Sequence, residues 1–186
     1  HAIPLARRGY RVTGIDLSPL FIEKARERAD IAQADAEFLV GDMHALETTV
    51  GQRAPFDAMI IMFTSNGYYG RESDLELFRQ LGRLASPRPA VVVLTVTRDW
   101  LMRYFEHEGL DSAGPIRILQ RRRMNLETST MHSEWEFYQV EAEDLRLQLK
   151  LRLDHRIYSL HELKALLEEA GWKYLVGLGS DRGEQS

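Results

Sequence analysis

Two apolar runs constrain the fold of this chain more than any other feature. One is "FDAMIIMFTS", which is apolar almost without interruption from Asp57 to Phe63, and the other is "AVVVLTV", from Ala90 to Val96. Neither run alternates apolar with polar residues, so we expect each to form a strand that is buried on both faces. Strands of this kind belong to parallel sheets that helices cover on both sides.

The opening of the chain places a short helix and a strand before these runs. Pro4 suits the first turn of a helix that begins near His1, and Gly9 predicts its end. The stretch "YRVTGID" then predicts a strand that ends at Asp16. In a chain that alternates helices with strands, a strand and a tight loop should precede the first helix. We therefore expect the sequence to begin inside its fold.

The alternation continues through the first half of the chain. Ser18 and Pro19 predict the start of a helix that runs to about Ala34. The stretch "AEFLVGDM" gives a short strand ending at Gly41 and Asp42, and "SDLELFRQLGRL" gives another helix. The expected inner faces of the two helices comprise Phe21, Ile22, Ala25 and Ala29, and Leu75, Leu77, Phe78, Leu81 and Leu84. This order predicts an α/β fold with an open, doubly wound, mostly parallel sheet.

The pattern changes beyond residue 100. The stretches "IRILQRRRMNL", "TMHSEWEFYQV" and "LRLQLKLRL" predict antiparallel strands, and the last, Leu145 to Leu153, should have one buried and one exposed face. Ser159 and Glu162 form a capping box for a helix, and "WKYLVGL" after Gly171 predicts a further strand. We therefore expect an α/β core from residues 1–100 and 156–186, with an antiparallel β insertion over 101–155 that acts as a lid or substrate cover.

Composition narrows the function classes. The 186 residues carry a formal net charge of −4 and contain no cysteine. These values argue against a nucleic-acid partner and exclude disulfides, thiolate nucleophiles and Cys-ligated metals. No segment is long and apolar enough for a membrane span, so we expect a cytoplasmic protein without a membrane partner. A second copy of the chain, in a homodimer, is left open as a partner.

Polar residues gather where the expected strands end, which is where doubly wound sheets bind ligands. A carboxylate at Asp16 can accept hydrogen bonds from both hydroxyls of a ribose. Asp42 can accept from an exocyclic amino group while Met43 packs against a base. Acidic residues after strands are also common helix caps, and for Asp42 the two interpretations are equally open. For Asp16 the cap is less favoured, because Ser18 already fits that role.

Four longer stretches carry a more specific signal: "HAIPLARRGYRVTGIDLSPLFIEKARERA", "AEFLVGDMHAL", "FDAMIIMFTSNGYYG" and "YSLHELKALLEEAGW". They resemble the class I S-adenosylmethionine-dependent methyltransferases, and the resemblance covers nearly the whole chain. It is closest to the small-molecule branch of the family, and it implies a Rossmann-like fold with S-adenosylmethionine as cofactor and S-adenosylhomocysteine as product. In that family a glycine-rich cofactor loop would precede His1, so we expect weak or absent cofactor binding by these 186 residues alone.

The resemblance also implies roles for individual residues. The implied cofactor-binding residues are Asp16, Leu17, Gly41, Asp42, Met43, Phe63 and Thr64. Residues that can line a substrate pocket are Asn66, Tyr68, Tyr69 and Trp135. Two features depart from the family pattern: "SPRPA", Ser86 to Ala90, replaces a Pro-Gly-Gly loop, and Asn66 stands where relatives often carry an aromatic or small residue. The second departure leaves the substrate open.

The expected chemistry is in-line methyl transfer to a small-molecule N or O acceptor, which needs alignment and exclusion of water more than covalent catalysis. No catalytic residue is assigned. His132 is a candidate general base for a hydroxyl acceptor, although a surface or structural role is favoured because the sequence identifies no orienting partner. No metal site is expected, because His107, His155 and His161 lack ligand spacing with carboxylates.

Two alternatives remain at this level. A nicotinamide-dependent (NAD(P)) oxidoreductase also carries a ribose-binding acid after its second strand. The strand ends at Asp42 and "FTSNGYYG" and the late antiparallel insertion favour methyl transfer instead. A non-catalytic, methyltransferase-like binding or scaffold protein is the second alternative.

Overall fold

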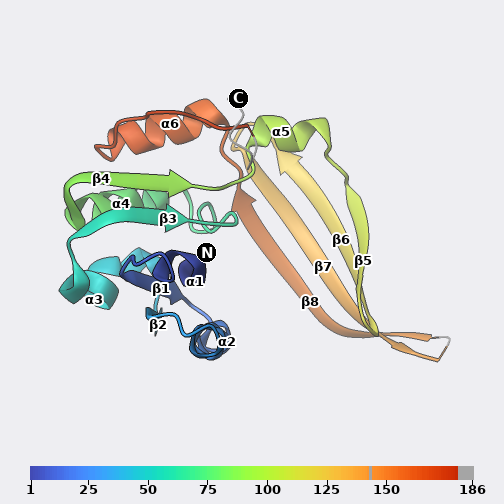
Figure 1. Cartoon of the computed structure of the whole chain (residues 1–186). Helices are drawn as coiled ribbons and strands as arrows, with labels where there is room; N and C mark the ends of the chain where they lie inside the picture. Colours follow the sequence, from blue (N-terminus) through green and yellow to red (C-terminus); the bar gives the residue numbers. More distant parts are fainter. Residues whose placement is uncertain (143, 180–186) are drawn as a thin grey trace. The chain divides into compact units, whose positions relative to one another are not determined.

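The structure is a computed structural model that describes residues 1–142 and 144–179. It divides into two compact units. Unit 1 comprises residues 1–58 and 76–90, and unit 2 comprises residues 59–75 and 91–186 as far as they are described. The elements are labelled in Figure 1.

Unit 1 begins with the predicted helix, strand, helix and strand. These elements are α1 (Ala2–Ala6), β1 (Val12–Asp16), α2 (Pro19–Ile31) and β2 (Ala36–Val40). The Oγ of Ser18 accepts a hydrogen bond from the backbone N of Phe21, so the predicted cap of α2 is confirmed. Ile22, Ala29 and Phe38 form the buried core between α2 and the strands. Phe21 is 62% exposed, so its predicted place on the inner face is wrong.

Unit 1 also contains short helical turns after β2 and residues 76–83 of α4 (Arg71–Arg83). The turns are η1 (Met43–Ala45), α3 (Leu46–Val50) and η2 (Gly51–Arg53). The side-chain amide of Gln80 donates a hydrogen bond of 2.8 Å to the backbone oxygen of His44. Arg83 forms a further link through its ion pair with Glu47. These contacts connect the segment after β2 to α4.

The predicted strand, helix and strand of the middle region are present. They are β3 (Phe56–Ile61), α4 (Arg71–Arg83) and β4 (Ala85–Val93), and β3 pairs with β4 with their arrows in the same direction (Figure 1). The predicted inner face of α4 is confirmed, since its four apolar residues and Leu84, directly after the helix, are all buried. Two expectations for the strands are wrong. Ile60 and Val92 are 44% and 54% exposed, because alternate side chains of β3 and β4 lack a covering helix among the described residues. Residues 86–90 are strand rather than loop.

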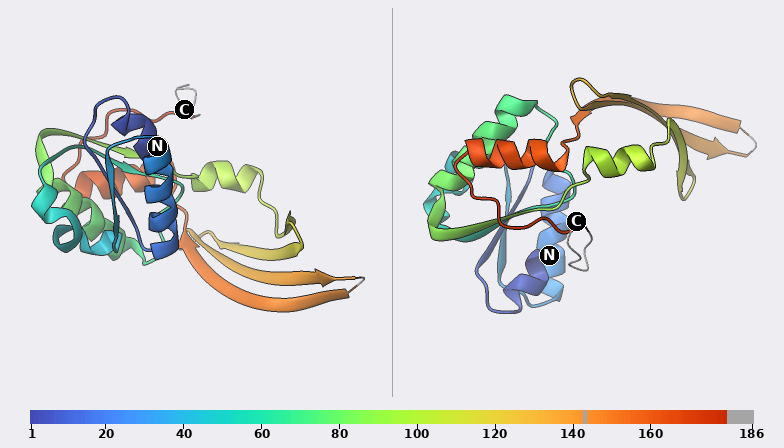
Figure 2. Two further views of the ribbon diagram at one scale, coloured as in Figure 1. Left: turned by 60° about the horizontal axis from the view of Figure 1, so that its bottom comes forward. Right: turned by 90° about the horizontal axis from the view of Figure 1, so that it is seen from above.

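Unit 2 contains the predicted antiparallel sheet. After α5 (Arg98–Arg103) come β5 (Glu108–Ala113), β6 (Ile116–Asn125), β7 (Thr130–Glu141) and β8 (Asp144–Arg156), paired in that order. Figure 2 shows the strong curvature of β7 and β8. The expectation of a buried leucine face on β8 is wrong, since the five leucines from Leu145 to Leu153 are 38–58% exposed. β8 is an edge strand, and the described residues cover these side chains only in part.

Helix α6 (Leu160–Glu169) follows the sheet. Its capping box is complete: the Oγ of Ser159 accepts from the backbone N of Glu162, and the carboxylate of Glu162 accepts from the backbone N of Ser159. The strand predicted for "WKYLVGL" is not formed within residues 172–177. In the described part of the chain, no helix has the length and apolar character needed to span a membrane.

Candidate functional site

The parallel pairing of β1 with β2 brings two of the predicted ligand positions together. Asp16 and Val40 are direct partners in the register, and the backbone N of Gly41 donates a 3.0 Å hydrogen bond to the backbone oxygen of Asp16. Asp42 follows at once. The two acidic residues therefore end adjacent strands on the same edge of the sheet, as the sequence predicted.

Asp16 is exposed at the end of β1. Its Oδ1 accepts a 2.8 Å hydrogen bond from the backbone N of Ser18, which fixes the carboxylate at the start of α2. The next residue, Leu17, is 62% exposed. Because each carboxylate oxygen accepts more than one hydrogen bond, Asp16 keeps lone pairs for the two hydroxyls of a ribose.

Asp42 acts as the N-cap of η1. Its Oδ1 accepts from the backbone N of His44 at 2.8 Å and lies 3.1 Å from Nδ1 of the same histidine. The backbone hydrogen bond from His44 is the largest cause that lowers the pKa of Asp42, so the group is an anion at neutral pH. The capping interpretation is thus correct for Oδ1, and the carboxylate retains capacity to accept from an amino group.

Gly41 has a specific reason to be glycine. A Cβ at this position would lie 2.4 Å from Cγ2 of Thr49, whose hydroxyl is held by the backbone oxygen of Ala45. The chain can therefore pass this close to α3 only without a side chain. Met43, which begins η1, is half-buried beside it. Close packing of Gly41 against Thr49 thus fixes the path of the chain directly after β2.

In unit 2, the end of β3 presents a second group of predicted residues. Phe63 and Thr64 have positive φ angles of 54° and 60°, an uncommon backbone conformation outside glycine. They line a hollow of about 310 Å³ together with Leu94, Thr95 and Val96, which follow β4. Phe63 is 71% exposed. A largely apolar hollow therefore lies at the ends of β3 and β4.

The predicted substrate residues differ in accessibility. Tyr68 and Tyr69 are 37% and 60% exposed, whereas Asn66 is 2% exposed. The side-chain oxygen of Asn66 is buried and has no hydrogen-bond partner among the described residues. Trp135 is half-buried on β7. Of the predicted substrate residues on this turn, the two tyrosines are therefore the ones accessible to a ligand.

Sequence reasoning missed a buried polar cluster beneath this turn. Asp74 is fully buried and accepts hydrogen bonds from the backbone N of Gly67 at 3.0 Å and from the hydroxyl of Tyr158 at 2.6 Å. Burial, and then the hydrogen bond to Asp74, raises the pKa of Tyr158. Two features of the sequence could have indicated this cluster. Asp74 stands beside the apolar positions of α4, and Tyr158, much later in the chain, directly precedes the helix cap Ser159.

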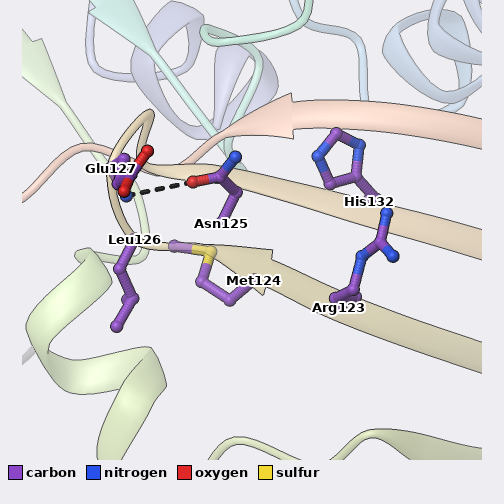
Figure 3. Close-up of a pocket in the computed structure, with 6 residues that line it drawn as sticks. All are labelled: Arg123, Met124, Asn125, Leu126, Glu127 and His132. Atoms are coloured by element: carbon purple, nitrogen blue, oxygen red, sulfur yellow. Dashed lines mark hydrogen bonds between the residues drawn. The ribbon is translucent and has the colours of Figure 1, made fainter.

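His132 has the partner that the sequence did not reveal. Its Nδ1 lies 2.7 Å from Oδ1 of Asp154 on the neighbouring strand. With Arg123 it borders a hollow of about 490 Å³ at the β6–β7 turn, where Asn125 accepts from the backbone N of Glu127 (Figure 3). Because side chains alternate along a strand, His132 and Trp135 lie on opposite faces of the sheet. They cannot line one pocket.

The fold defines the class of protein: an α/β protein with the Rossmann-like fold of methyltransferases and an added antiparallel sheet. Residues 1–88 match the family model described as "Methyltransferase domain". This part of the chain is therefore similar to the methyltransferase-domain family, and the similarity supports S-adenosylmethionine as the methyl donor.

Several solved structures share this fold. The chain resembles the CcbJ methyltransferase from Streptomyces caelestis with a TM-score of 0.79 and 18% identity, over 100% of this chain and 73% of that one. It resembles the sugar N-methyltransferase KedS8 from Streptoalloteichus sp ATCC 53650 with a TM-score of 0.63 and 16% identity, over 92% and 68% of the two chains. It resembles CalS10, an amino pentose methyltransferase from Micromonospora echinaspora, with a TM-score of 0.64 and 17% identity, over 94% of this chain and 71% of that one. No curated protein sequence matches. The predicted class and fold are confirmed.

Proposed function

We propose that this chain transfers the methyl group of S-adenosylmethionine to a nitrogen or oxygen atom of a small molecule by in-line displacement. The observation that carries the proposal is the pairing of β1 with β2, which sets Asp16 beside Gly41 and Asp42 at one edge of the sheet. Two anionic acceptors on adjacent strand ends suit the ribose and the amino group of an adenosine.

The donor set fits the cofactor chemically. We assign Asp16 and Leu17 to the ribose, Gly41, Asp42 and Met43 to the adenine, and Phe63 and Thr64 to the region of the sulfonium. The bound cofactor would supply an electrophilic methyl group on a positively charged sulfur. Asp16 and Asp42 would orient it through hydrogen bonds, while the apolar hollow at Phe63 would exclude water.

On the acceptor side, we assign Asn66, Tyr68, Tyr69 and Trp135 to the substrate. An amine acceptor must arrive neutral, because its lone pair forms the new N–C bond as the C–S bond breaks. The sulfur leaves as the thioether of S-adenosylhomocysteine, and the methylated ammonium then loses one proton to water. The faces of Tyr68 and Tyr69 can attract the positive charge that develops on nitrogen.

A nitrogen acceptor on an amino sugar is the first substrate class to test. Two proteins of the same fold, KedS8 and CalS10, are described as a sugar N-methyltransferase and an amino pentose methyltransferase. An amine also needs no strong general base, and His132 lies on the sheet face opposite to Trp135. These points favour N over O methylation.

Two measurements test the proposal. The first is calorimetric titration of the chain with S-adenosylhomocysteine and with NADH, with any residues that the gene encodes before His1 included. The second is incubation with S-adenosylmethionine and a panel of amino sugars, with mass spectrometry of the products. Binding of S-adenosylhomocysteine and one added methyl group support the proposal. Binding of NADH with hydride transfer would establish the oxidoreductase instead, and cofactor binding without any product would leave a binding protein.

The similarity to known methyltransferases does not address the remaining expectations. A cytoplasmic location, a homodimer and the lack of a nucleic-acid partner stay predictions. So do the division of the chain at residues 100 and 156 and the site assignments above.

A further inference from the structure

The turn after β3 adopts a conformation that its own sequence does not favour. Phe63 and Thr64 have φ angles of 54° and 60°, and Gly67 and Gly70 have φ angles of 101° and 85°. Non-glycine residues with positive φ persist only where surrounding structure holds them. The contacts that hold this turn therefore matter for what it presents.

The end of β8 supplies one of these contacts through a histidine at an apolar position. Leu149, Leu151 and Leu153 alternate along one face of β8, and the next residue on that face is His155. Its side chain is buried, with 5% exposure, and its Nε2 lies 2.8 Å from the backbone oxygen of Asn66. A carbonyl oxygen only accepts, so Nε2 carries the hydrogen.

The same imidazole supports an aromatic side chain of the turn. The ring of Tyr68 lies parallel to that of His155, with centroids 4.2 Å apart and an interplanar angle of 6°. Tyr68 is 37% exposed, so one side of its ring rests on the histidine and the rest is open to a ligand. The position of His155 therefore sets the position of Tyr68.

Backbone contacts at Gly67 also hold the turn in place. The backbone N of Arg156 donates a 2.8 Å hydrogen bond to the oxygen of Gly67, and a Cβ on Gly67 would lie 2.2 Å from the oxygen of Arg156. From the other side, Asp74 accepts from the backbone N of Gly67. The turn is thus held between β8 and α4.

We propose that His155 is a positioning residue for the methyl acceptor: it donates its Nε2 hydrogen to Asn66 and stacks on Tyr68, and so fixes the turn that receives the acceptor. This inference rests on the proposed function. A leucine at this position would continue the apolar alternation of β8 but would provide neither the hydrogen bond nor the flat ring.

The surroundings keep the imidazole neutral. Burial is the largest influence and lowers the pKa of His155, while its hydrogen bond to Asn66 and the charge of Asp74 act in the opposite direction. The other titratable or charged groups at this cluster are Tyr158 and Tyr68, together with Arg156. The ring is therefore neutral at neutral pH, with its single hydrogen on Nε2, where the hydrogen bond to Asn66 needs it.

Two substitutions separate the two contacts. His155→Phe keeps a flat ring against Tyr68 and removes the donor, whereas His155→Gln keeps a donor and removes the ring. His107→Phe is the matched control, because His107 is exposed, its ring packs edge-on against Phe105, and the substitution leaves its backbone hydrogen bond from Arg122 in place. The readouts are hydrogen exchange over residues 62–70, calorimetry with S-adenosylhomocysteine, and kinetics with the amino sugar that the product screen identifies.

For His155→Phe we expect faster exchange in the turn and a fall in kcat/KM for the acceptor of about tenfold, the size of one lost hydrogen bond. The affinity for S-adenosylhomocysteine should stay within about twofold, and His155→Gln should recover part of the loss. Unchanged acceptor kinetics in His155→Phe would overturn the proposal even if exchange increases, since the role would then be structural. Equal losses for cofactor and acceptor would also overturn it. If S-adenosylhomocysteine does not bind the parent protein, the proposed function itself fails, and the acceptor role of His155 is withdrawn with it.

Discussion

Replacing Tyr158 with phenylalanine tests the buried cluster beneath the β3 turn. The substitution removes only the hydroxyl that donates to Oδ2 of Asp74 at 2.6 Å. Asp74 is fully buried and Tyr158 is 3% exposed, so water cannot readily replace the lost donor. A hydrogen bond to a charged group contributes about 1.5–3 kcal/mol, and we expect the free energy of unfolding to fall by that amount.

Urea unfolding followed by circular dichroism measures this change. For a chain of this length, the loss corresponds to a decrease in Tm of about 3–12 °C. Tyr104→Phe is the matched control, because Tyr104 is 66% exposed, and it should stay within about 0.5 kcal/mol of the parent. Asp74→Asn and the double variant complete a cycle that isolates the coupling of the pair.

The pKa of Tyr158 gives the same test a pH dependence. Because folding raises this pKa, the stabilisation is fully present below the unfolded value, which is about 10 for tyrosine, and is lost as pH rises beyond it. The difference in free energy of unfolding between the parent and Tyr158→Phe should therefore become smaller above pH 10. A deficit below about 0.5 kcal/mol at pH 7 would refute the assignment of a strong, buried hydrogen bond.

Three further predictions concern other parts of the molecule. Asp16→Ala should lower the affinity for S-adenosylhomocysteine at least about tenfold in calorimetry, since hydrogen bonds to a charged acceptor are lost; unchanged affinity would make Asp16 only structural. Gly41→Ala should reduce the free energy of unfolding by about 1–3 kcal/mol, and Thr49→Ala in the same chain should restore part of it, because the added Cβ meets the Thr49 side chain. The hydrogen bond from Lys150 is the largest cause that lowers the pKa of Glu136 to about 2, so this carboxylate stabilises the fold above its ordinary pKa of 4.5 and the stabilisation is lost as pH falls toward 2. In Glu136→Gln, the free energy of unfolding should therefore depend less on pH over that range, and an unchanged pH profile would contradict the prediction.

The sequence predicted the order and type of most elements because the signals are local. The cap at Ser18, the capping box at Ser159 and the apolar face of α4 each depend on residues within a few turns of one another. Burial of strand faces was predicted less well. Whether Ile60 or Val92 is covered depends on what packs against the sheet, and a single strand's residues do not contain that information.

The leucines of β8 do not share one face of the strand, because the pairing of β7 with β8 contains one irregularity. Phe137 pairs with Leu149, but Tyr138 pairs with Leu147, so the register shifts by one residue between them. Directly paired residues share a face and neighbours along a strand do not, which places Leu147 and Leu149 on opposite faces. The alternation in "LRLQLKLRL" is perfect in the sequence and still does not give one continuous apolar face.

The turn after β3 shows the same division at the candidate site. The sequence offered "TSNGYYG" as a set of equivalent polar and aromatic candidates, and Gly67 provided the backbone freedom for the turn. The structure distinguishes them, since it buries Asn66 and leaves Tyr68 accessible, and it does so through a hydrogen bond from His155, 89 residues away. No local pattern encodes a contact at that separation. The candidate ligand residues were therefore predictable from their place at a strand end. The contact from His155 was not, because it forms only once β8 has folded against the turn.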